Sequence, residues 1–166
     1  MPVYRVCFVC SGNICRSPTA EVVLRTLVEE AGLADSVVVE SAGTGDWHVG
    51  AGADDRAVAA LRRRGYPMRL HCARQIRAAD LARCDLLVAL DAEHARALRR
   101  LAGGSEQAAK VRLLRSFDPA AEAGDLDVPD PYYGGPRTFD HVLDLVEAGC
   151  RGLLDEVRTA MAARSP

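Results

Sequence analysis

The feature of this sequence that most constrains its fold is the alternation of short apolar runs with segments whose apolar residues recur at helical spacing. The first run, residues 3–9, is apolar except for Tyr4 and Arg5, which is typical of a strand covered on both faces. Further strands are predicted at residues 37–39, 86–89 and 111–114. Helices are predicted at residues 18–31, 53–64, 92–101 and 139–157. This alternation favours an α/β fold in which a parallel sheet lies between layers of helices.

Length and composition narrow the remaining possibilities. The chain has 166 residues, of which 49% are apolar, and no internal repeat or linker, so we expect one domain over residues 1–166. The net charge of −2 gives no basic patch for nucleic acid. No apolar stretch is long enough to span a membrane, and no signal-peptide pattern precedes the first strand. We therefore expect a cytoplasmic protein without a nucleic-acid or membrane partner; export without a signal peptide stays open.

The loop after the first strand is the candidate active site, because ligands of parallel α/β sheets bind beyond the carboxyl ends of the strands. It reads Cys10-Ser11-Gly12-Asn13-Ile14-Cys15-Arg16 and leads into Ser17-Pro18, which suits an N-cap and the first position of a helix. A cysteine and an arginine at this spacing are expected about once by chance in such a chain. Their position between a buried strand and a helix is the informative part.

These residue types suit phosphoryl chemistry. Backbone N–H groups in a loop that leads into a helix surround an anion, and the same partial positive charge stabilises a thiolate. Cys10 is therefore predicted to be a nucleophile placed for in-line attack on phosphorus. The guanidinium of Arg16 can bind two phosphoryl oxygens and stabilise the transition state, and Gly12 allows close approach of the backbone.

Two other interpretations of these cysteines remain open from the residues alone. Cys10 could be a structural cysteine that ends a buried strand, with Arg16 at the surface. Cys7 and Cys10 could also belong to a zinc site, although residues three apart on a strand point to opposite faces and no second ligand pair has suitable spacing. We predict no metal and no cofactor.

The segment 9–18 resembles the phosphate-binding loop of the low-molecular-weight protein tyrosine phosphatases of bacterial type. Asp130-Pro131-Tyr132-Tyr133 is similar to the general-acid loop of that family. Ser41-Ala42-Gly43-Thr44 and the segment around His71 also match, so the resemblance covers essentially the whole chain. It implies a three-layer, flavodoxin-like α/β sandwich with a four-stranded parallel sheet in the order 2-1-3-4.

The resemblance implies hydrolysis of phosphotyrosine through a phosphocysteine intermediate, with Cys10 as nucleophile, Arg16 as phosphoryl ligand and Asp130 as general acid and then base. Asp125 and Asp127 lie nearby, and composition alone does not choose among the three. Substrate contacts are expected from Ser11, Gly12, Asn13, Ile14, Cys15, Ser17, Trp47, Tyr132 and Tyr133. A supporting hydrogen-bond network is expected from Asn13, Ser17, Ser41 and His71. Two of these have simpler interpretations, a helix cap for Ser17 and a structural histidine for His71.

Aromatic residues suggest how the substrate is selected. Trp47, the only tryptophan, lies in a glycine-rich loop. With Tyr132 and Tyr133 it could form walls against a phenyl ring, which would favour phosphotyrosine over the shorter phosphoserine. Trp47 could instead fix its loop to the sheet.

The other cysteines are interpreted in the light of the same resemblance. It implies that Cys15 can form a reversible disulfide with Cys10, which would protect the nucleophile from irreversible oxidation. Cys72, Cys84 and Cys150 lie in or beside apolar segments and are predicted to be core residues.

Two alternatives to the phosphatase remain. A thiol-dependent arsenate reductase has a similar loop, but it needs a further, closely spaced cysteine pair, which Cys72 and Cys84 do not resemble. A non-catalytic phosphotyrosine-binding module would bind its ligand without turnover. For the phosphatase we expect a phosphotyrosine-containing protein as substrate, inorganic phosphate as product and competitive ligand, and a monomeric chain.

Overall fold

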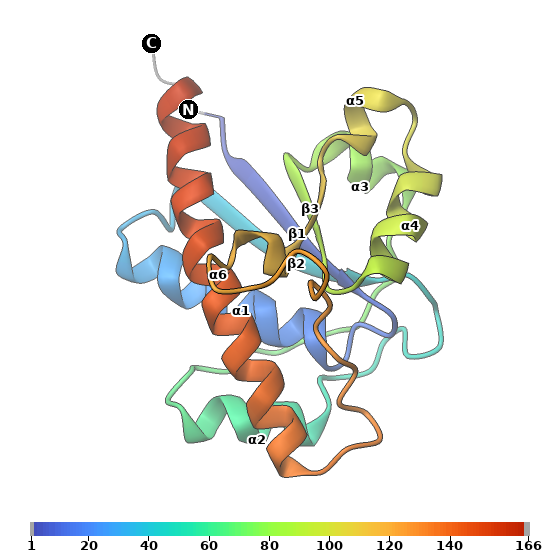
Figure 1. Cartoon of the computed structure of the whole chain (residues 1–166), viewed down its shortest axis with the longest axis vertical. Helices are drawn as coiled ribbons and strands as arrows, with labels where there is room; N and C mark the ends of the chain where they lie inside the picture. The colour runs from blue at the N-terminus through green and yellow to red at the C-terminus, as the bar shows by residue number, and fades with distance from the viewer. Residues whose placement is uncertain (1, 165–166) are drawn as a thin grey trace.

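The computed structural model describes residues 2–164 (Figure 1). A parallel sheet at its centre has the order β2-β1-β3-β4 and consists of β1 (Tyr4–Cys10), β2 (Val37–Gly43), β3 (Leu86–Ala89) and β4 (Val111–Leu113). The predicted order 2-1-3-4 is confirmed. In the register of the inner strands, Cys10 pairs with Gly43 and Val9 pairs with Ala89. The nucleophile candidate Cys10 therefore ends a strand that has a neighbour on each side.

Helices cover both faces of the sheet, as Figure 1 shows. One side carries α1 (Arg16–Glu30), α2 (Asp55–Arg63) and α6 (Pro136–Arg164), and the other carries α3 (Ala78–Arg83), α4 (Ala92–Leu101) and α5 (Ser105–Ala108). Alternate residues of β1 enter different cores, because Phe8 and Cys10 pack with α1 and α6 whereas Cys7 and Val9 pack with α3 and α4. Cys7 and Cys10 thus lie on opposite faces, as predicted.

The start of α1 corrects one prediction. The N-cap is Cys15 rather than Ser17, and the helix begins at Arg16. The hydroxyl of Ser17 lies within hydrogen-bond distance of Cys10 and Asn13 instead, so this serine serves the preceding loop. The other end is as predicted: Gly32 follows the helix in the left-handed region, with φ 73°.

Most other elements lie where the pattern predicts them, and β3 and α4 have the predicted bounds. Three short elements were not predicted: α3, α5 and a 3₁₀ helix at Leu114–Phe117. None exceeds six residues, which is too short to show a helical repeat in the sequence. No helix within residues 2–164 is both long and apolar enough to cross a lipid bilayer.

The carboxyl ends of the strands bring three segments to one edge of the sheet. The loop of residues 10–16 (the 10–16 loop) follows β1, and residues 44–54 follow β2. The segment 124–136 (the 124–136 loop) reaches the same edge because the backbone N–H of Val128 donates to the carbonyl of Leu90, just after β3, at 2.8 Å. Residues far apart in the sequence therefore meet above Cys10.

Candidate active site

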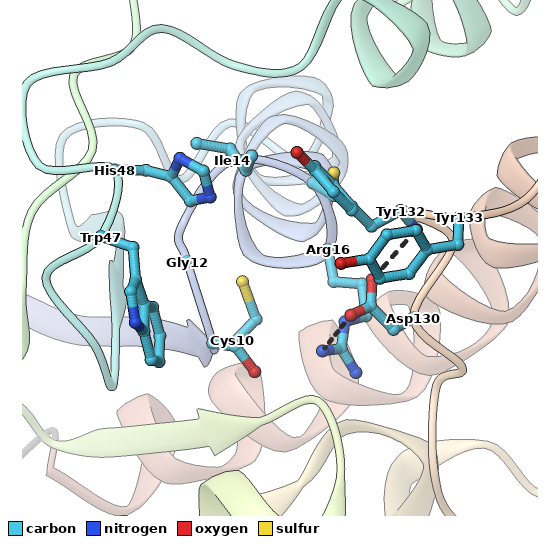
Figure 2. Close-up of a pocket in the computed structure, with 11 residues that line it drawn as sticks. Cys10, Gly12, Ile14, Arg16, Trp47, His48, Asp130, Tyr132 and Tyr133 are labelled. Carbon is cyan, nitrogen blue, oxygen red and sulfur yellow. Dashed lines mark hydrogen bonds and ion pairs between the residues drawn. The ribbon is translucent and has the colours of Figure 1, made fainter.

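A cavity of about 300 Å³ opens at this edge, directly above the end of β1 (Figure 2). It is lined by Cys10, Ser11, Gly12, Ile14, Cys15, Arg16, Trp47, His48, Asp130, Tyr132 and Tyr133. Figure 2 shows the sulfur of Cys10 directed into the space between Trp47 and His48 on one side and Tyr132 and Tyr133 on the other. The 10–16 loop forms the floor.

The backbone of the 10–16 loop is oriented by hydrogen bonds to its carbonyl oxygens. The carbonyls of Cys10 and Ser11 accept from the N–H groups of Thr44 and Gly45 at 2.8 and 3.0 Å, and the carbonyl of Ile14 accepts from Asp54 at 2.8 Å. By contrast, no described residue accepts a hydrogen bond from the N–H groups of residues 12–15. A loop whose carbonyls are occupied and whose N–H groups are free is suited to bind an anion.

The side chain of Asn13 fixes the turn of this loop through hydrogen bonds to residues beneath it. It has φ 57°, a left-handed conformation that asparagine tolerates better than most residues. Its side chain is fully buried and donates to Ser17 Oγ at 2.8 Å and to Ser41 Oγ at 2.9 Å, and its Oδ1 accepts from the N–H of Arg74 at 3.0 Å. Both N–H donors and the carbonyl oxygen of this buried amide are therefore engaged, which fixes the loop in one shape.

The other predicted support residues join this network. His71 Nε2 lies 2.7 Å from the carbonyl oxygen of Asn13, and Ser41 donates to Glu21 at 2.7 Å. The four predicted support residues thus meet, although Asn13 and His71 are 58 residues apart in the sequence. They are Asn13, Ser17, Ser41 and His71. Asn13 and Ser17, expected also among the substrate contacts, lie beneath the loop and do not line the cavity.

Cys10 is almost completely buried, with 3% of its surface exposed. Its sulfur lies 2.9 Å from the hydroxyl oxygen of Ser17, which can donate to a thiolate there. The rest of the residue packs in the core, and the sulfur is directed into the cavity.

Arg16 is fixed by partners at one end of its guanidinium. Nη1 donates to Asp91 Oδ2 at 2.8 Å and to the carbonyl of Val128 at 3.0 Å, while Nη2 lies 3.5 Å from His94 Nε2 and 3.7 Å from Asp130 Oδ2. The side chain is only 4% exposed. The Nη1 group is thus occupied by the protein, and the Nε and Nη2 groups remain for two oxygens of a ligand.

Asp91 and His94 were not predicted as site residues, but they form a unit behind Arg16, in which His94 is buried and Asp91 is half-buried. The carboxylate of Asp91 accepts from the backbone N–H of His94, and His94 Nδ1 accepts from that of Asp91, which closes the first turn of α4. His94 Nε2 lies 2.9 Å from Ser11 Oγ. The unit therefore connects the start of α4 with two residues of the 10–16 loop.

The protonation states of this unit follow from its surroundings. Burial, reinforced by the charge of Arg16, lowers the pKa of His94 to about 4, so the imidazole is neutral at pH 7. Burial opposes ionisation of Asp91, but the charge of His94 when it is protonated, and the hydrogen bonds from Arg16 and from the backbone N–H of His94, outweigh it and hold the pKa of this carboxyl below its usual value. Arg16 thus has an ionised partner at neutral pH.

The 124–136 loop carries three aspartates with different surroundings. Asp125 pairs with Arg115 at 3.1 Å, and Asp127 accepts from the N–H of Ala92 at 2.9 Å. Only Asp130 lines the cavity, with a side chain that is 54% exposed and faces Arg16. Its Oδ1 accepts from the N–H of Tyr132 at 3.1 Å, a local turn that directs the carboxyl group inward.

Aromatic side chains form the two walls of the cavity. Tyr132 and Tyr133 make an edge-to-face pair with ring centres 4.9 Å apart, and the Tyr132 ring lies 6.4 Å from that of His48. Trp47 is 70% exposed, so it does not anchor its loop through burial, which was the alternative interpretation. His48 was not predicted; it lies against Gly12, where a Cβ would be 2.7 Å from its ring.

The remaining cysteines have distinct positions. Cys15 also lines the cavity, and burial raises its pKa to about 12, so it is a neutral thiol. Cys84 and Cys150 are buried, as predicted. The prediction for Cys72 is wrong: it is exposed, because residues 66–74 form neither helix nor strand and follow the surface. Within residues 2–164 no group of three potential metal ligands is found.

Comparison with known proteins agrees with this site. Residues 5–163 match the family described as low molecular weight phosphotyrosine protein phosphatase. The low molecular weight protein-tyrosine-phosphatase of Streptomyces coelicolor is 59% identical over 162 residues, 98% of each chain. The low molecular weight protein-tyrosine phosphatase A of Mycobacterium tuberculosis is 50% identical over 161 residues, 97% of this chain and 96% of the other.

Solved structures support the same assignment. YfkJ from Bacillus subtilis superimposes with a TM-score of 0.89 at 35% identity, over 96% of this chain and 98% of that one. A protein tyrosine phosphatase from Entamoeba histolytica also gives 0.89, at 30% identity, over 95% and 99% of the two chains. The expected flavodoxin-like fold is thus confirmed, and the chain belongs to the low molecular weight phosphotyrosine protein phosphatase family.

Proposed function

We propose that this protein is a protein-tyrosine-phosphatase that hydrolyses phosphotyrosine in protein substrates, with Cys10 as nucleophile, Arg16 as phosphoryl ligand and Asp130 as proton donor. One observation carries the proposal. The thiol of Cys10, the guanidinium of Arg16 and the carboxyl of Asp130 all face one cavity of about 300 Å³, and its floor is the 10–16 loop, in which the N–H groups of residues 12–15 have no acceptor among the described residues. Family membership supports the same reaction.

In the first step, the Cys10 thiolate attacks phosphorus and the bond between phosphorus and the tyrosine oxygen breaks. The negative charge that spreads over the three equatorial oxygens is stabilised by the loop N–H groups and by Nε and Nη2 of Arg16. Asp130, in its protonated form, transfers its proton to the departing phenolate oxygen. The products of this step are a tyrosine side chain and a phosphocysteine.

In the second step, water attacks the phosphocysteine. The carboxylate of Asp130 accepts a proton from that water, the sulfur–phosphorus bond breaks, and the thiolate of Cys10 is regenerated with a hydrogen bond from Ser17. Inorganic phosphate is released and, because it fits the same anion-binding loop, also competes with substrate. No metal or cofactor takes part in this scheme.

Preference for phosphotyrosine follows from the depth of the cavity. Cys10 lies at its floor, and the rings of Trp47, Tyr132 and Tyr133 stand along its walls. A phenyl ring spans this depth and stacks between aromatic walls, whereas a phosphoserine side chain is too short to bring its phosphate to the sulfur while its backbone stays at the rim. The aromatic walls thus select for a side chain long enough to bring its phosphate to the sulfur of Cys10.

The rival reactions have less support. An arsenate reductase would need further cysteines to transfer a disulfide from Cys10, but Cys72 is exposed and Cys84 lies in the core on the other face of the sheet. A binding module without catalysis would not need the acid Asp130 opposite Arg16.

We further propose that residues 1–166 act as a single, monomeric phosphatase domain in the cytoplasm.

The decisive experiment measures hydrolysis of a phosphotyrosine peptide by the parent protein and by Cys10→Ser, Asp130→Asn and Asp125→Asn. We expect no turnover by Cys10→Ser and a loss of kcat of about 100-fold or more for Asp130→Asn, the usual contribution of a general acid. Asp125→Asn is the matched control, because it removes a carboxylate from the same loop outside the cavity, and we expect parental kcat.

The outcomes separate the alternatives. A phosphoserine peptide should be hydrolysed far more slowly than the phosphotyrosine peptide by the parent protein. Turnover by Cys10→Ser would refute the covalent mechanism. Equal losses in Asp130→Asn and Asp125→Asn would refute the assignment of the acid, and a parent that is inert towards phosphotyrosine but reduces arsenate with a thiol would favour the rival reductase.

A further inference from the structure

A second cavity, of about 310 Å³, adjoins the active site on the side of α4. It is lined by Ser11, Thr44, Trp47, Glu93, His94, Arg96, Ala97 and Arg100. Two of these residues, Ser11 and Trp47, also line the active-site cavity. In Figure 2, Trp47 stands across the active-site cavity from Tyr132 and Tyr133. Because Trp47 lines both cavities, its side chain forms the wall between them.

The charged wall of this second cavity comes from one face of α4. Glu93, Arg96 and Arg100 follow each other at intervals of three and four residues, which places them in one row along a helix. Over residues 2–164 neither Arg96 nor Arg100 forms a hydrogen bond or an ion pair. Other arginines of the structure do pair with carboxylates, as Arg64 does with Asp144 at 2.7 Å.

The net charge of the lining is positive. Arg96 and Arg100 contribute two positive charges and Glu93 one negative charge, while His94 is neutral at pH 7 because its pKa is lowered by burial and by Arg16. The hydroxyls of Ser11 and Thr44 add hydrogen-bond donors. Two guanidinium groups without partners beside hydroxyl donors are suited to a carboxylate.

The wall between the cavities has a defined position. The indole of Trp47 lies directly over Gly45, where a Cβ would be 1.8 Å from a ring carbon. A phosphotyrosine bound against this wall leaves its main chain at the rim, and the neighbouring residues of an extended peptide follow at about 3.3 Å each. A side chain one or two residues from the phosphotyrosine therefore reaches the far side of Trp47.

We infer that this second cavity is a substrate subsite for the carboxylate of an aspartate or glutamate that flanks the phosphotyrosine, bound by Arg96 and Arg100. The inference rests on the proposed phosphatase function and adds a substrate class to it. The lining has a net charge of +1, because Glu93 offsets one of the two arginines. A carboxylate, with one negative charge, balances that net charge, whereas a doubly charged phosphate group would exceed it.

The test compares kcat/KM for phosphotyrosine peptides that carry glutamate or glutamine on either side of the phosphotyrosine. The proteins are the parent, Arg96→Gln, Arg100→Gln and the double variant. We expect the parent to prefer the glutamate peptide, and each single variant to lose roughly 2- to 5-fold of that preference, as for one partly exposed ion pair. The preference should also shrink as ionic strength rises.

Arg99→Gln is the matched control. Arg99 is exposed on the same helix and its removal changes the net charge equally, but it does not line the second cavity. An equal loss of preference in Arg99→Gln and Arg100→Gln would overturn the subsite in favour of general electrostatic attraction. A parent that hydrolyses both peptides equally well would overturn the subsite and leave the phosphatase function intact.

A binding measurement keeps the subsite testable if the parent hydrolyses neither peptide. The only tryptophan, Trp47, lies between the two cavities, so its fluorescence reports binding by Cys10→Ser directly. We expect tighter binding of the glutamate peptide than of the glutamine peptide, and loss of the difference when Arg96→Gln and Arg100→Gln are added. Equal affinities for the two peptides would refute the subsite.

Discussion

Substitution of Gly43 by alanine should damage the active site although Gly43 does not line it. Gly43 ends β2 beside Cys10, and a Cβ there would lie 2.7 Å from the carbonyl oxygen of Ser11 and 3.2 Å from the backbone nitrogen of Asn13. The first distance is about 0.7 Å short of the 3.4 Å at which ordinary contact begins. The atoms that would be displaced belong to the backbone of the 10–16 loop.

Gly43 itself cannot easily move away from the loop. Its N–H donates to the carbonyl of Arg74 at 2.8 Å, and its carbonyl accepts from the N–H of Ile76 at 2.7 Å. The strain therefore falls on the 10–16 loop, and we expect Gly43→Ala to lower the free energy of unfolding by about 1–3 kcal/mol, the usual cost of overpacking. A displacement of roughly half an ångström in a positioned loop should lower kcat/KM by about 10-fold or more.

The assay is hydrolysis of p-nitrophenyl phosphate, combined with the inhibition constant of inorganic phosphate and urea unfolding. The matched control is Gly124→Ala, because Gly124 has no atom within 4 Å of the position of a Cβ and its φ is not left-handed. Parental kcat/KM and phosphate affinity in Gly43→Ala would refute the reasoning, since the loop would then accommodate the methyl group without losing its anion-binding shape.

Two further predictions concern groups around the 10–16 loop. Because burial and Arg16 lower the pKa of His94 to about 4, the unfolded chain binds a proton below pH 6.5 that the folded chain does not, and stability falls as the pH falls through this range. We expect His94→Gln to lose less unfolding free energy than the parent between pH 7 and pH 5, by roughly 2 kcal/mol in urea titrations; parallel curves for the two proteins would contradict this. Ser17→Ala removes the hydroxyl 2.9 Å from the sulfur of Cys10, and we expect kcat to fall about 10- to 100-fold, as for a lost hydrogen bond to a charged group. Ser116→Ala, which removes an exposed hydroxyl elsewhere, should leave kcat unchanged, and an equally active Ser17→Ala would show that the thiolate does not need this donor.

Much of the fold could be predicted from the sequence because most strands and helices show a distinct pattern of apolar residues. The run Leu86–Ala89 and the helix Ala92–Leu101 lie where they were predicted, since a buried strand needs a continuous apolar run and a surface helix needs a periodic one. The start of α1 was not accessible. Serine is a common N-cap residue, but the hydroxyl of Ser17 contacts the sulfur of Cys10 instead of capping the helix. No local sequence rule predicts such a contact.

The site was predictable where residues share a motif and not where they meet only in three dimensions. The chemistry of the 10–16 loop predicts Cys10 and Arg16, the resemblance adds Asp130, and the structure places all three at one cavity. Asp91 and His94 were missed, although a signal exists: they open a predicted helix after a predicted strand, at the edge where ligands bind. Sequence spacing alone does not show that this turn packs against Arg16.

The cavity combines a buried floor with exposed walls, and this division has an evolutionary consequence. Asn13 and Arg16 are held by several partners inside the protein, so most substitutions there unfold the loop or remove activity. Trp47 and Tyr133 stand in solvent, the latter 95% exposed, and substitutions at such positions usually change stability by less than about 0.5 kcal/mol. A lineage can therefore exchange its wall residues by nearly neutral drift and acquire new phosphoprotein targets while the reaction itself is inherited unchanged.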